Sequence, residues 1–268
     1  MPKFAANLTM MFNEYAFLDR FKAAADAGFD AVEFLFPYDH PAQKIADQLD
    51  QNSLYLALFN CPPGVWASGE RGLSALPHRA EEFQRSVQTA LDYAVALKVP
   101  TLHVMSGLAD KADQSALASY RAALAFACTA AGRHGINIVI EPINARDMLG
   151  YFLNDFHFAA RLIADMALPN LKLQYDIYHR QIIHGDVMMS LEALMPIIGH
   201  VQTASVPNRH EPLTGELDDM RIFQHLDALG YQGFVGCEYR PAQGTVAGLD
   251  WLLNTANKKR HALERNEI

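Results

Sequence analysis

The chain is poor in cysteine, in basic residues and in long apolar runs, and each shortage excludes a class of protein. Its three cysteines, Cys61, Cys128 and Cys237, lie far apart and form no CxxC pair. This excludes a disulfide framework, a zinc–thiolate site and a thioredoxin-type redox motif, and it favours a reduced, cytoplasmic setting. The formal net charge of −8 argues against a nucleic-acid partner, because phosphate binding needs a basic surface. No stretch approaches the roughly 20 apolar residues of a membrane span, so we expect no membrane partner.

The sequence contains a regular alternation of short apolar runs, which are typical of strands, and longer segments whose apolar residues recur at helical spacing. We expect strands at 4–8, 31–35, 54–59, 101–105, 137–141, 171–176, 200–203 and 234–238. We expect helices near 15–27, 41–50, 78–97, 114–134, 154–166, 187–198 and 220–229, and a last one that carries Leu249, Leu252 and Leu253. Strands separated by helices imply right-handed crossovers and a parallel sheet. Eight such units in about 250 residues predict an α/β fold. The prediction is a single-domain (β/α)8 TIM barrel over residues 1–256, followed by a polar C-terminal tail at 257–268. A doubly wound open sheet is the alternative, but the chain has no GxGxxG turn and no Walker-type lysine loop.

One connection is longer than the others. Residues 60–77 are rich in glycine and proline and contain Trp66, Glu70 and Arg71. Loops of this length inside compact domains are usually functional or disordered. The tryptophan indicates an ordered wall, or a lid that closes over a substrate.

Four of the expected strands carry, at or next to their last residue, a side chain with a carboxylate or amide oxygen. These side chains are Glu141, Asp176, Gln202 and Glu238. In a (β/α)8 barrel the C-terminal ends of the strands converge on one face, which holds the active site. Three carboxylates brought together unpaired would repel one another, and a divalent cation removes that repulsion. Oxygen ligands without a thiolate favour Mg²⁺ or Mn²⁺ over zinc. The alternative is that each residue only caps its strand or pairs with a nearby arginine.

Other polar residues lie near the same predicted rim. His179 follows Asp176 by three residues and could be a fifth ligand, a group behind the ligands or a hydrogen-bond donor to substrate. His103 lies within an expected strand, and that position indicates its role less clearly than the position of His179 does. Glu33 occupies a similar strand position and would hold a histidine in one tautomer. Arg209 would grip a carboxylate with two parallel bonds, and a surface salt bridge is its alternative.

Two glutamates at one metal suggest a reaction class. Aldose–ketose isomerisation moves a proton between neighbouring carbons through an enediolate. It needs a base on one carbon, an acid on the other and a cation that holds both oxygens. Glu141 and Glu238 would come from different sides of the mouth and flank the substrate as the catalytic pair. The metal would polarise the carbonyl and stabilise the developing negative charge.

Seven stretches, spread in order over nearly the whole chain, carry a family resemblance. They are FAANLTM at 4–10, VEFLFPY at 32–38, GERGL at 69–73, IEPIN at 140–144, QYDIYH at 174–179, RHEP at 209–212 and GCEY at 236–239. Together they resemble the hydroxypyruvate isomerase family, within the larger xylose-isomerase-like barrel group. The resemblance implies a (β/α)8 barrel that interconverts hydroxypyruvate and tartronate semialdehyde. It also implies that Glu141 and Glu238 transfer the proton, and that Glu141, Asp176, Gln202 and Glu238 hold the metal.

Substrate contacts are predicted from His179, Arg209, Glu70, Arg71 and His103. One departure from the family bears on them. Family members commonly read Gly-Glu-Ile-Asn-Tyr after the Arg-His-Glu-Pro loop, whereas this chain reads GELDD at 215–219 and lacks the tyrosine. The family's substrate contacts in that loop are therefore not carried over to this chain.

The resemblance leaves the substrate open between two close relatives. The 2-oxo-tetronate isomerases share nearly the same motifs and act on an acid that is one carbon longer. The IEPIN and QYDIYH stretches read closer to the hydroxypyruvate type, which we place first. Another small-sugar isomerase or epimerase of the same barrel group is a further alternative.

Two other functions are less compatible with the residues. A metal-dependent nuclease of the endonuclease IV kind would need several metal ions, a histidine-rich mouth and a basic groove, which the charge of −8 opposes. A non-catalytic binding barrel would have no use for an acid–base pair such as Glu141 and Glu238. We therefore expect a small 2-oxo or hydroxy acid as the partner, with no nucleic acid and no membrane. A homo-oligomer is compatible with the sequence.

Overall fold

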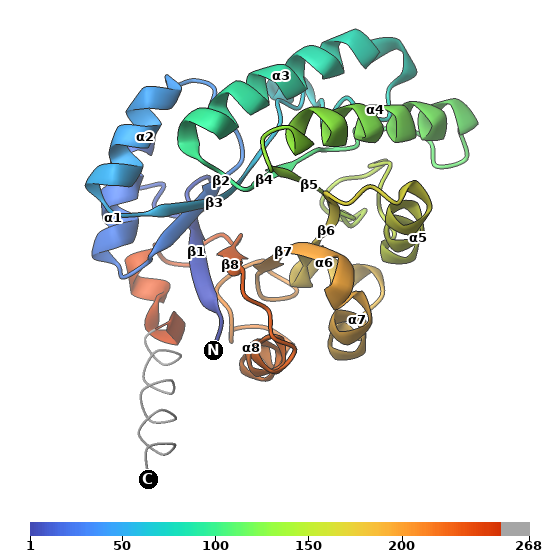
Figure 1. Ribbon diagram of the computed structural model, residues 1–268. Helices are drawn as coiled ribbons and strands as arrows, with labels where there is room; N and C mark the ends of the chain where they lie inside the picture. Colours follow the sequence, from blue (N-terminus) through green and yellow to red (C-terminus); the bar gives the residue numbers. More distant parts are fainter. Residues whose placement is uncertain (253–268) are drawn as a thin grey trace.

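The computed structural model describes residues 1–252, which form one closed barrel of eight parallel strands surrounded by helices (Figure 1). Each strand pairs with the next along the chain, and β8 closes on β1. The strands are β1 Lys3–Asn7, β2 Ala31–Phe34, β3 Tyr55–Asn60, β4 Thr101–His103, β5 Asn137–Ile140, β6 Leu171–Asp176, β7 Ile198–Thr203 and β8 Phe234–Cys237. The predicted single-domain (β/α)8 barrel is confirmed. The predicted tail at 257–268 and Leu253 of the expected last helix lie outside the described residues.

Helices follow the strands and form the outer ring of the molecule. The α-helices are α1 Arg20–Asp26, α2 Ala42–Gln51, α3 Ala80–Leu97, α4 Gln114–Gly132, α5 Phe156–Met166, α6 Ile177–Ile183, α7 Val187–Leu194 and α8 Asp219–Ala228. Short 3-10 turns lie at Phe17–Asp19, Trp66–Ser68, Pro77–Arg79, Met195–Ile197 and Val246–Gly248. In the described part of the chain, no helix is both long and apolar enough to cross a membrane.

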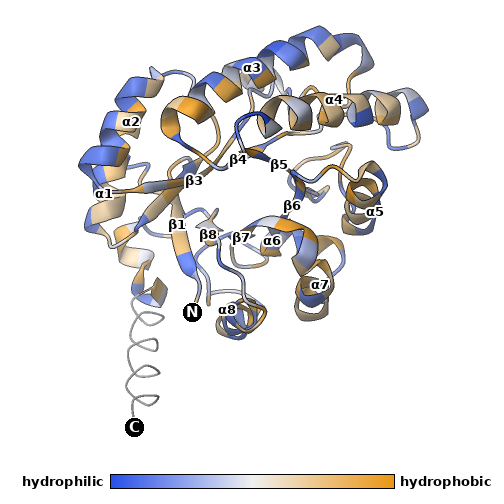
Figure 2. Cartoon of the chain, in the orientation of Figure 1, coloured by the Kyte–Doolittle hydropathy of each residue, from blue (hydrophilic) through white to orange (hydrophobic). Residues whose placement is uncertain are grey.

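The main hydrophobic core lies between the sheet and the helices, and a small second cluster of Ala5, Ala31 and Ala57 lies on the other face of the strands. Successive side chains of a strand point to opposite faces of the sheet. In β1, Phe4 and Ala6 belong to the main apolar cluster that packs on the helices, whereas Asn7 faces inward and bonds Glu33 of β2. The helices turn their apolar sides toward the strands (Figure 2). The inner face is therefore free to carry polar groups up to the mouth of the barrel.

One local expectation was wrong. The next helix after the strand at 171–176 was expected only at 187–198, but α6 begins directly after Asp176, at Ile177. Asp176 is the N-cap of α6, because its Oδ1 accepts hydrogen bonds from the backbone N–H groups of Tyr178 at 2.7 Å and His179 at 3.3 Å. The cap fixes one oxygen of Asp176, leaves the other free, and places His179 in the first turn of a helix at the barrel mouth.

Candidate active site

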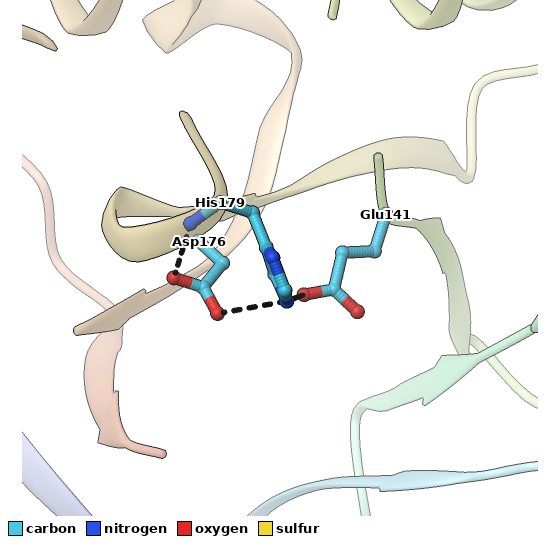
Figure 3. Close-up of side chains that lie close together, drawn as sticks. All are labelled: Glu141, Asp176 and His179. Carbon is cyan, nitrogen blue, oxygen red and sulfur yellow. Dashed lines mark hydrogen bonds and ion pairs between the residues drawn. The ribbon is translucent and has the colours of Figure 1, made fainter. Parts of the chain in front are cut away.

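Three buried side chains meet at the mouth of the barrel. Glu141 follows β5, Asp176 ends β6 and His179 lies in α6. The Nε2 atom of His179 is 3.8 Å from Oε1 of Glu141 and 3.7 Å from Oδ2 of Asp176 (Figure 3). Within residues 1–252, this is the one group of three His, Cys, Asp or Glu side chains that could hold a metal ion, with one nitrogen or oxygen of each lying within 4.8 Å of the others.

Two carboxylate oxygens in this group have no hydrogen-bond partner. They are Oε1 of Glu141 and Oδ2 of Asp176, and both are buried. Buried polar atoms are normally paired, because leaving one unpaired costs free energy. The two oxygens thus indicate a place where a ligand supplies the missing contact.

The carboxyl groups of the mouth hold protons more tightly than ordinary ones. Burial, followed by the charges of Glu238 and Asp176, raises the pKa of Glu141 well above its usual value. Burial raises the pKa of Asp176 to about 6, although Arg209 opposes the rise. Burial raises the pKa of Glu238 to about 8, again against the effect of Arg209. This is the behaviour expected of several desolvated carboxyls that share one site.

His179 is held in one tautomer by Asn144. Its Nδ1 atom accepts hydrogen bonds from the backbone N–H of Asn144 at 3.3 Å and from the side-chain Nδ2 at 2.6 Å. The amide of Asn144 is itself oriented, because its Oδ1 accepts from the backbone N–H of Asp147 at 2.9 Å. Burial, Arg209 and His103 lower the pKa of His179, so the ring is neutral. A neutral ring that accepts at Nδ1 carries its proton on Nε2, so His179 presents a donor rather than a metal-binding lone pair to the mouth.

Behind the mouth, Glu33 organises the inner face of the barrel. Its Oε1 accepts from the amides of Gln202 at 2.8 Å and Asn7 at 3.0 Å, and its Oε2 lies 2.6 Å from Nε2 of His200. The expected contact between Glu33 and a histidine is present. Gln202 also accepts from Nε2 of Gln174 at 2.7 Å, which leaves one lone pair of its Oε1 free. The side-chain oxygen of Gln202 is therefore oriented by two neighbours.

The position of Glu33 depends on a glycine in strand β8. A Cβ atom at Gly236 of β8 would collide with both carboxylate oxygens of Glu33. Two residues of the GCEY stretch therefore contribute to the site. Gly236 leaves space for the Glu33 carboxylate, and Glu238 lies two residues later at the rim of the barrel.

Arg209 is the cation of the mouth and touches three carboxylates. Its guanidinium lies 3.2 Å from Asp147, 3.6 Å from Asp176 and 3.5 Å from Glu238, and its side chain is 11% exposed. It also lies over the ring of Tyr178, with 4.9 Å between guanidinium carbon and ring centroid. Its backbone has a φ of 57°, which is uncommon for a residue other than glycine.

Asp147 connects the groups that surround Arg209 and His179. Besides Arg209, its carboxylate accepts from the Tyr178 hydroxyl at 3.2 Å and from Nδ2 of Asn144 at 3.4 Å. Sequence reasoning assigned no role to Asn144, Asp147 or Tyr178. Asn144 and Tyr178 do lie in the IEPIN and QYDIYH stretches, so their position in those motifs was the available signal.

The structure separates the remaining predicted substrate contacts into two groups. His103 lies in the mouth, with Nε2 3.8 Å from Oε2 of Glu141. Glu70 instead binds Arg79 at 2.7 Å, and Arg71 lies 3.9 Å over the ring of Trp66. These contacts order the loop at 60–77 within itself and against α3. A substrate role for Glu70 and Arg71, and closure of the loop, stay predictions.

The donor set fits a hard divalent cation. The mouth contains four carboxylates, from Glu141, Asp147, Asp176 and Glu238, against the single guanidinium of Arg209. The two unpaired oxygens and the free lone pair of the neighbouring amide are all hard ligands, which Mg²⁺ and Mn²⁺ prefer. A cation at this position would offset the excess negative charge.

The closed barrel and its carboxylate-lined mouth at the C-terminal ends of the strands define a (β/α)8-barrel protein with its site where barrel enzymes have theirs. The chain belongs to the xylose isomerase-like TIM barrel family, whose family model matches residues 21–255. The resemblance seen in the sequence is thereby confirmed.

Named relatives are similar over nearly their whole length. A 2-oxo-tetronate isomerase of Cupriavidus necator is 53% identical over 94% of this chain and 98% of that protein. The hydroxypyruvate isomerase of Escherichia coli is 41% identical, also over 94% and 98%. A crystal structure described as an AP endonuclease, family 2, from Brucella melitensis is 46% identical with a TM-score of 0.93, covering 95% of this chain and 99% of that one.

Proposed function

We propose that this protein is a metal-dependent isomerase that moves the carbonyl of a small 2-oxo acid between neighbouring carbons, and that its preferred substrate is a four-carbon 2-oxo-tetronate. One observation carries the proposal. Two buried glutamates from different parts of the barrel, Glu141 and Glu238, share one mouth, and burial raises the pKa of Glu141 well above its usual value and that of Glu238 to about 8. General acid–base catalysis is most effective when the pKa of the group lies near the working pH.

The reaction needs one proton removed and one delivered. A 2-oxo-3-hydroxy acid loses the hydrogen on C3 to a base, and the electron pair forms an enediolate across C2 and C3. The proton of the C3 hydroxyl passes to the oxygen on C2, and protonation at C2 by the acid then leaves a 2-hydroxy-3-oxo acid. In our proposal Glu141 and Glu238 are this base and acid, and they exchange roles in the reverse direction.

The other groups of the mouth orient the substrate. His179 donates from Nε2, and Arg209 donates from its guanidinium, so both suit the oxygens of an anionic acid. Glu141, Asp176, Gln202 and Glu238 would hold Mg²⁺ or Mn²⁺. When bound, such a cation polarises the carbonyl and stabilises the negative charge that develops on its oxygen.

The relatives reverse the order of substrates that the motifs suggested. The Cupriavidus necator 2-oxo-tetronate isomerase is 53% identical, against 41% for the Escherichia coli hydroxypyruvate isomerase. We therefore propose the four-carbon acid first. Hydroxypyruvate, converted to tartronate semialdehyde, is the second candidate, supported by the latter relative and by the same reacting carbons.

The nuclease description of the Brucella melitensis structure does not suit this mouth. A phosphodiester substrate requires positive charge along its path, because phosphate contacts dominate nucleic-acid affinity. The chain has a net charge of −8, and the cation in its mouth, Arg209, is already surrounded by carboxylates.

Proton NMR in D₂O tests the proposal. Protein loaded with Mg²⁺ or Mn²⁺ is expected to convert 2-oxo-tetronate faster than hydroxypyruvate, with deuterium entering at the carbon that is protonated. Glu141→Gln and Glu238→Gln should each lower kcat by at least about a hundredfold, within the range for loss of a general acid or base. Glu192→Gln, an exposed glutamate of α7, is the matched control and should retain activity.

Two results would count against the proposal. The first is absence of turnover of either acid with both cations. The second is cleavage of a DNA duplex that contains an abasic site at a rate that Glu238→Gln abolishes, which would favour the nuclease instead.

A further inference from the structure

Strands β3 and β4 place two unpartnered polar side chains next to each other at the mouth. Asn60, the last residue of β3, is in register with His103, the last residue of β4. Register partners on neighbouring parallel strands point to the same face of the sheet. Both residues are more than nine-tenths buried, with 5% and 1% exposed.

Neither side chain is satisfied by the protein. Both ring nitrogens of His103 lack a hydrogen-bond partner. Among the described residues, Asn60 forms hydrogen bonds through its backbone, to Leu35 and Tyr38, but none through its side-chain amide. An amide that makes no side-chain hydrogen bond, beside an enclosed imidazole without partners, indicates a place for a polar ligand group.

This side of the mouth differs in charge from the opposite side. The guanidinium of Arg209 contacts groups on β6 and beyond β8, Asp176 and Glu238. His103 lies on the other flank of Glu141, with its Nε2 3.8 Å from Oε2 of that residue. Among the described residues, no lysine or arginine forms an ion pair with Glu141 or His103, so the guanidinium that suits a substrate carboxylate lies on the Arg209 side. The β3–β4 side therefore suits an uncharged group that both donates and accepts.

We propose that Asn60 and His103 form a hydroxyl-binding subsite that recognises the fourth carbon of the substrate. The inference rests on the proposed function and deepens it. The four-carbon acid differs from hydroxypyruvate by a hydroxymethyl group on the reacting C3. With the carboxylate on the Arg209 side, this group extends toward β3 and β4. A hydroxyl can donate one hydrogen bond and accept others through its lone pairs, which suits an amide beside an imidazole.

Such a subsite explains how one barrel distinguishes two acids with the same reacting carbons. A site built to hydrogen-bond a substrate hydroxyl discriminates against the analogue that lacks it, because the buried polar groups are then left unpaired. Asn60 and His103 thus act as specificity residues, while the proton transfer is carried out by the glutamates.

The kinetic test compares the two acids on the metal-loaded protein. Asn60→Ala is expected to lower kcat/KM for 2-oxo-tetronate roughly tenfold, mainly through KM, and that for hydroxypyruvate by less than about threefold. His103→Leu should shift the ratio in the same direction, and His103→Gln, which keeps a donor and an acceptor, should restore part of it. Asn52→Ala, at the end of α2, is the matched control and should leave the ratio unchanged. An equal fall for both acids in Asn60→Ala, or no fall, would overturn the subsite.

A binding measurement separates this inference from the proposed function. Calorimetric titration of the metal-loaded protein with threonate and with glycerate needs no turnover. The subsite predicts that Asn60→Ala weakens threonate binding roughly tenfold and glycerate binding much less. If the wild type turns over neither acid but shows this pattern, the reaction is wrong and the subsite stands. If turnover is present but Asn60→Ala weakens both ligands equally, the reaction stands and the subsite is refuted.

Discussion

Replacing Asn144 by aspartate is expected to move the proton of His179 and slow the isomerisation. In the wild type, Nδ1 of His179 accepts two hydrogen bonds from Asn144, at 3.3 and 2.6 Å. Moving the proton to Nδ1 would break both, at about 1 kcal/mol each. The Nε2–H tautomer is therefore favoured by about 2 kcal/mol, or roughly thirtyfold.

An aspartate at position 144 reverses this preference, because a carboxylate can only accept. At pH 8, where the ring is neutral, the variant should carry the proton on Nδ1. The lone pair of Nε2 would then face the carboxylates of Glu141 and Asp176, and the substrate would lose a donor. Loss of one directed donor to a developing oxyanion typically lowers kcat by roughly 10²–10³, and we expect a decrease of that size.

Nitrogen-15 correlation spectra of the imidazole ring report the tautomer directly, and kcat is measured at pH 8 on the same samples. Asn52→Asp adds the same charge at the end of α2 and serves as the control. The reasoning is refuted if Asn144→Asp keeps its proton on Nε2. It is equally refuted if the tautomer changes and kcat stays within threefold of the wild type.

Three further predictions follow from the burial of polar groups. Gly236→Ala should weaken Mn²⁺ binding by roughly tenfold or more and lower Tm, because the added Cβ displaces the Glu33 carboxylate. Calorimetric titrations with Mn²⁺ and melting curves that match those of the wild type would contradict this. Burial raises the pKa of Asp219 to about 6, so the native state loses stability as pH rises from about 4 through 6. Asp219→Asn should therefore unfold at higher urea than the wild type at pH 7.5, by about 1–3 kcal/mol, and show no such gain at pH 4. Since the pKa of Asp176 is about 6 and that of Glu238 about 8, the cation-free mouth holds protons at pH 7. Binding of Mg²⁺ or Mn²⁺ should displace about one proton or more, and it should be tighter at pH 8 than at pH 6. Calorimetric titrations in two buffers of different ionisation enthalpy would refute this if the heats of cation binding were equal.

Sequence reasoning reaches the barrel and the strand-end residues because both follow local rules. Apolar runs alternate with helical spacing, and the residue after each run falls at the rim where barrel strands converge. Glu141 and Asp176 can be found in this way, and the structure brings their oxygens together with His179. The glutamate of β2, Glu33, could likewise be expected to hold a histidine, although the sequence does not say which one.

The remaining features depend on segments that meet only in the folded chain. Asn144 lies in a recognisable stretch, but its role requires His179 to pack against it from the next βα unit. Asn60 has no signal of its own, because its pairing with His103 is set by the register between β3 and β4, which barrel closure determines. The start of α6 was missed because an aspartate at a strand end is also a good helix cap, and the cap decided the local structure.

Fold and chemistry occupy opposite faces of the same strands. The outward face packs on the helices and supplies the hydrophobic stabilisation, whereas the inward face carries buried carboxyls whose desolvation opposes folding. Neutral substitutions in the mouth should therefore abolish turnover and yet raise the melting temperature of the cation-free protein. A barrel arranged in this way can exchange its inner residues for those of another reaction with little risk to its architecture, which makes the mouth a favourable place for both evolution and redesign.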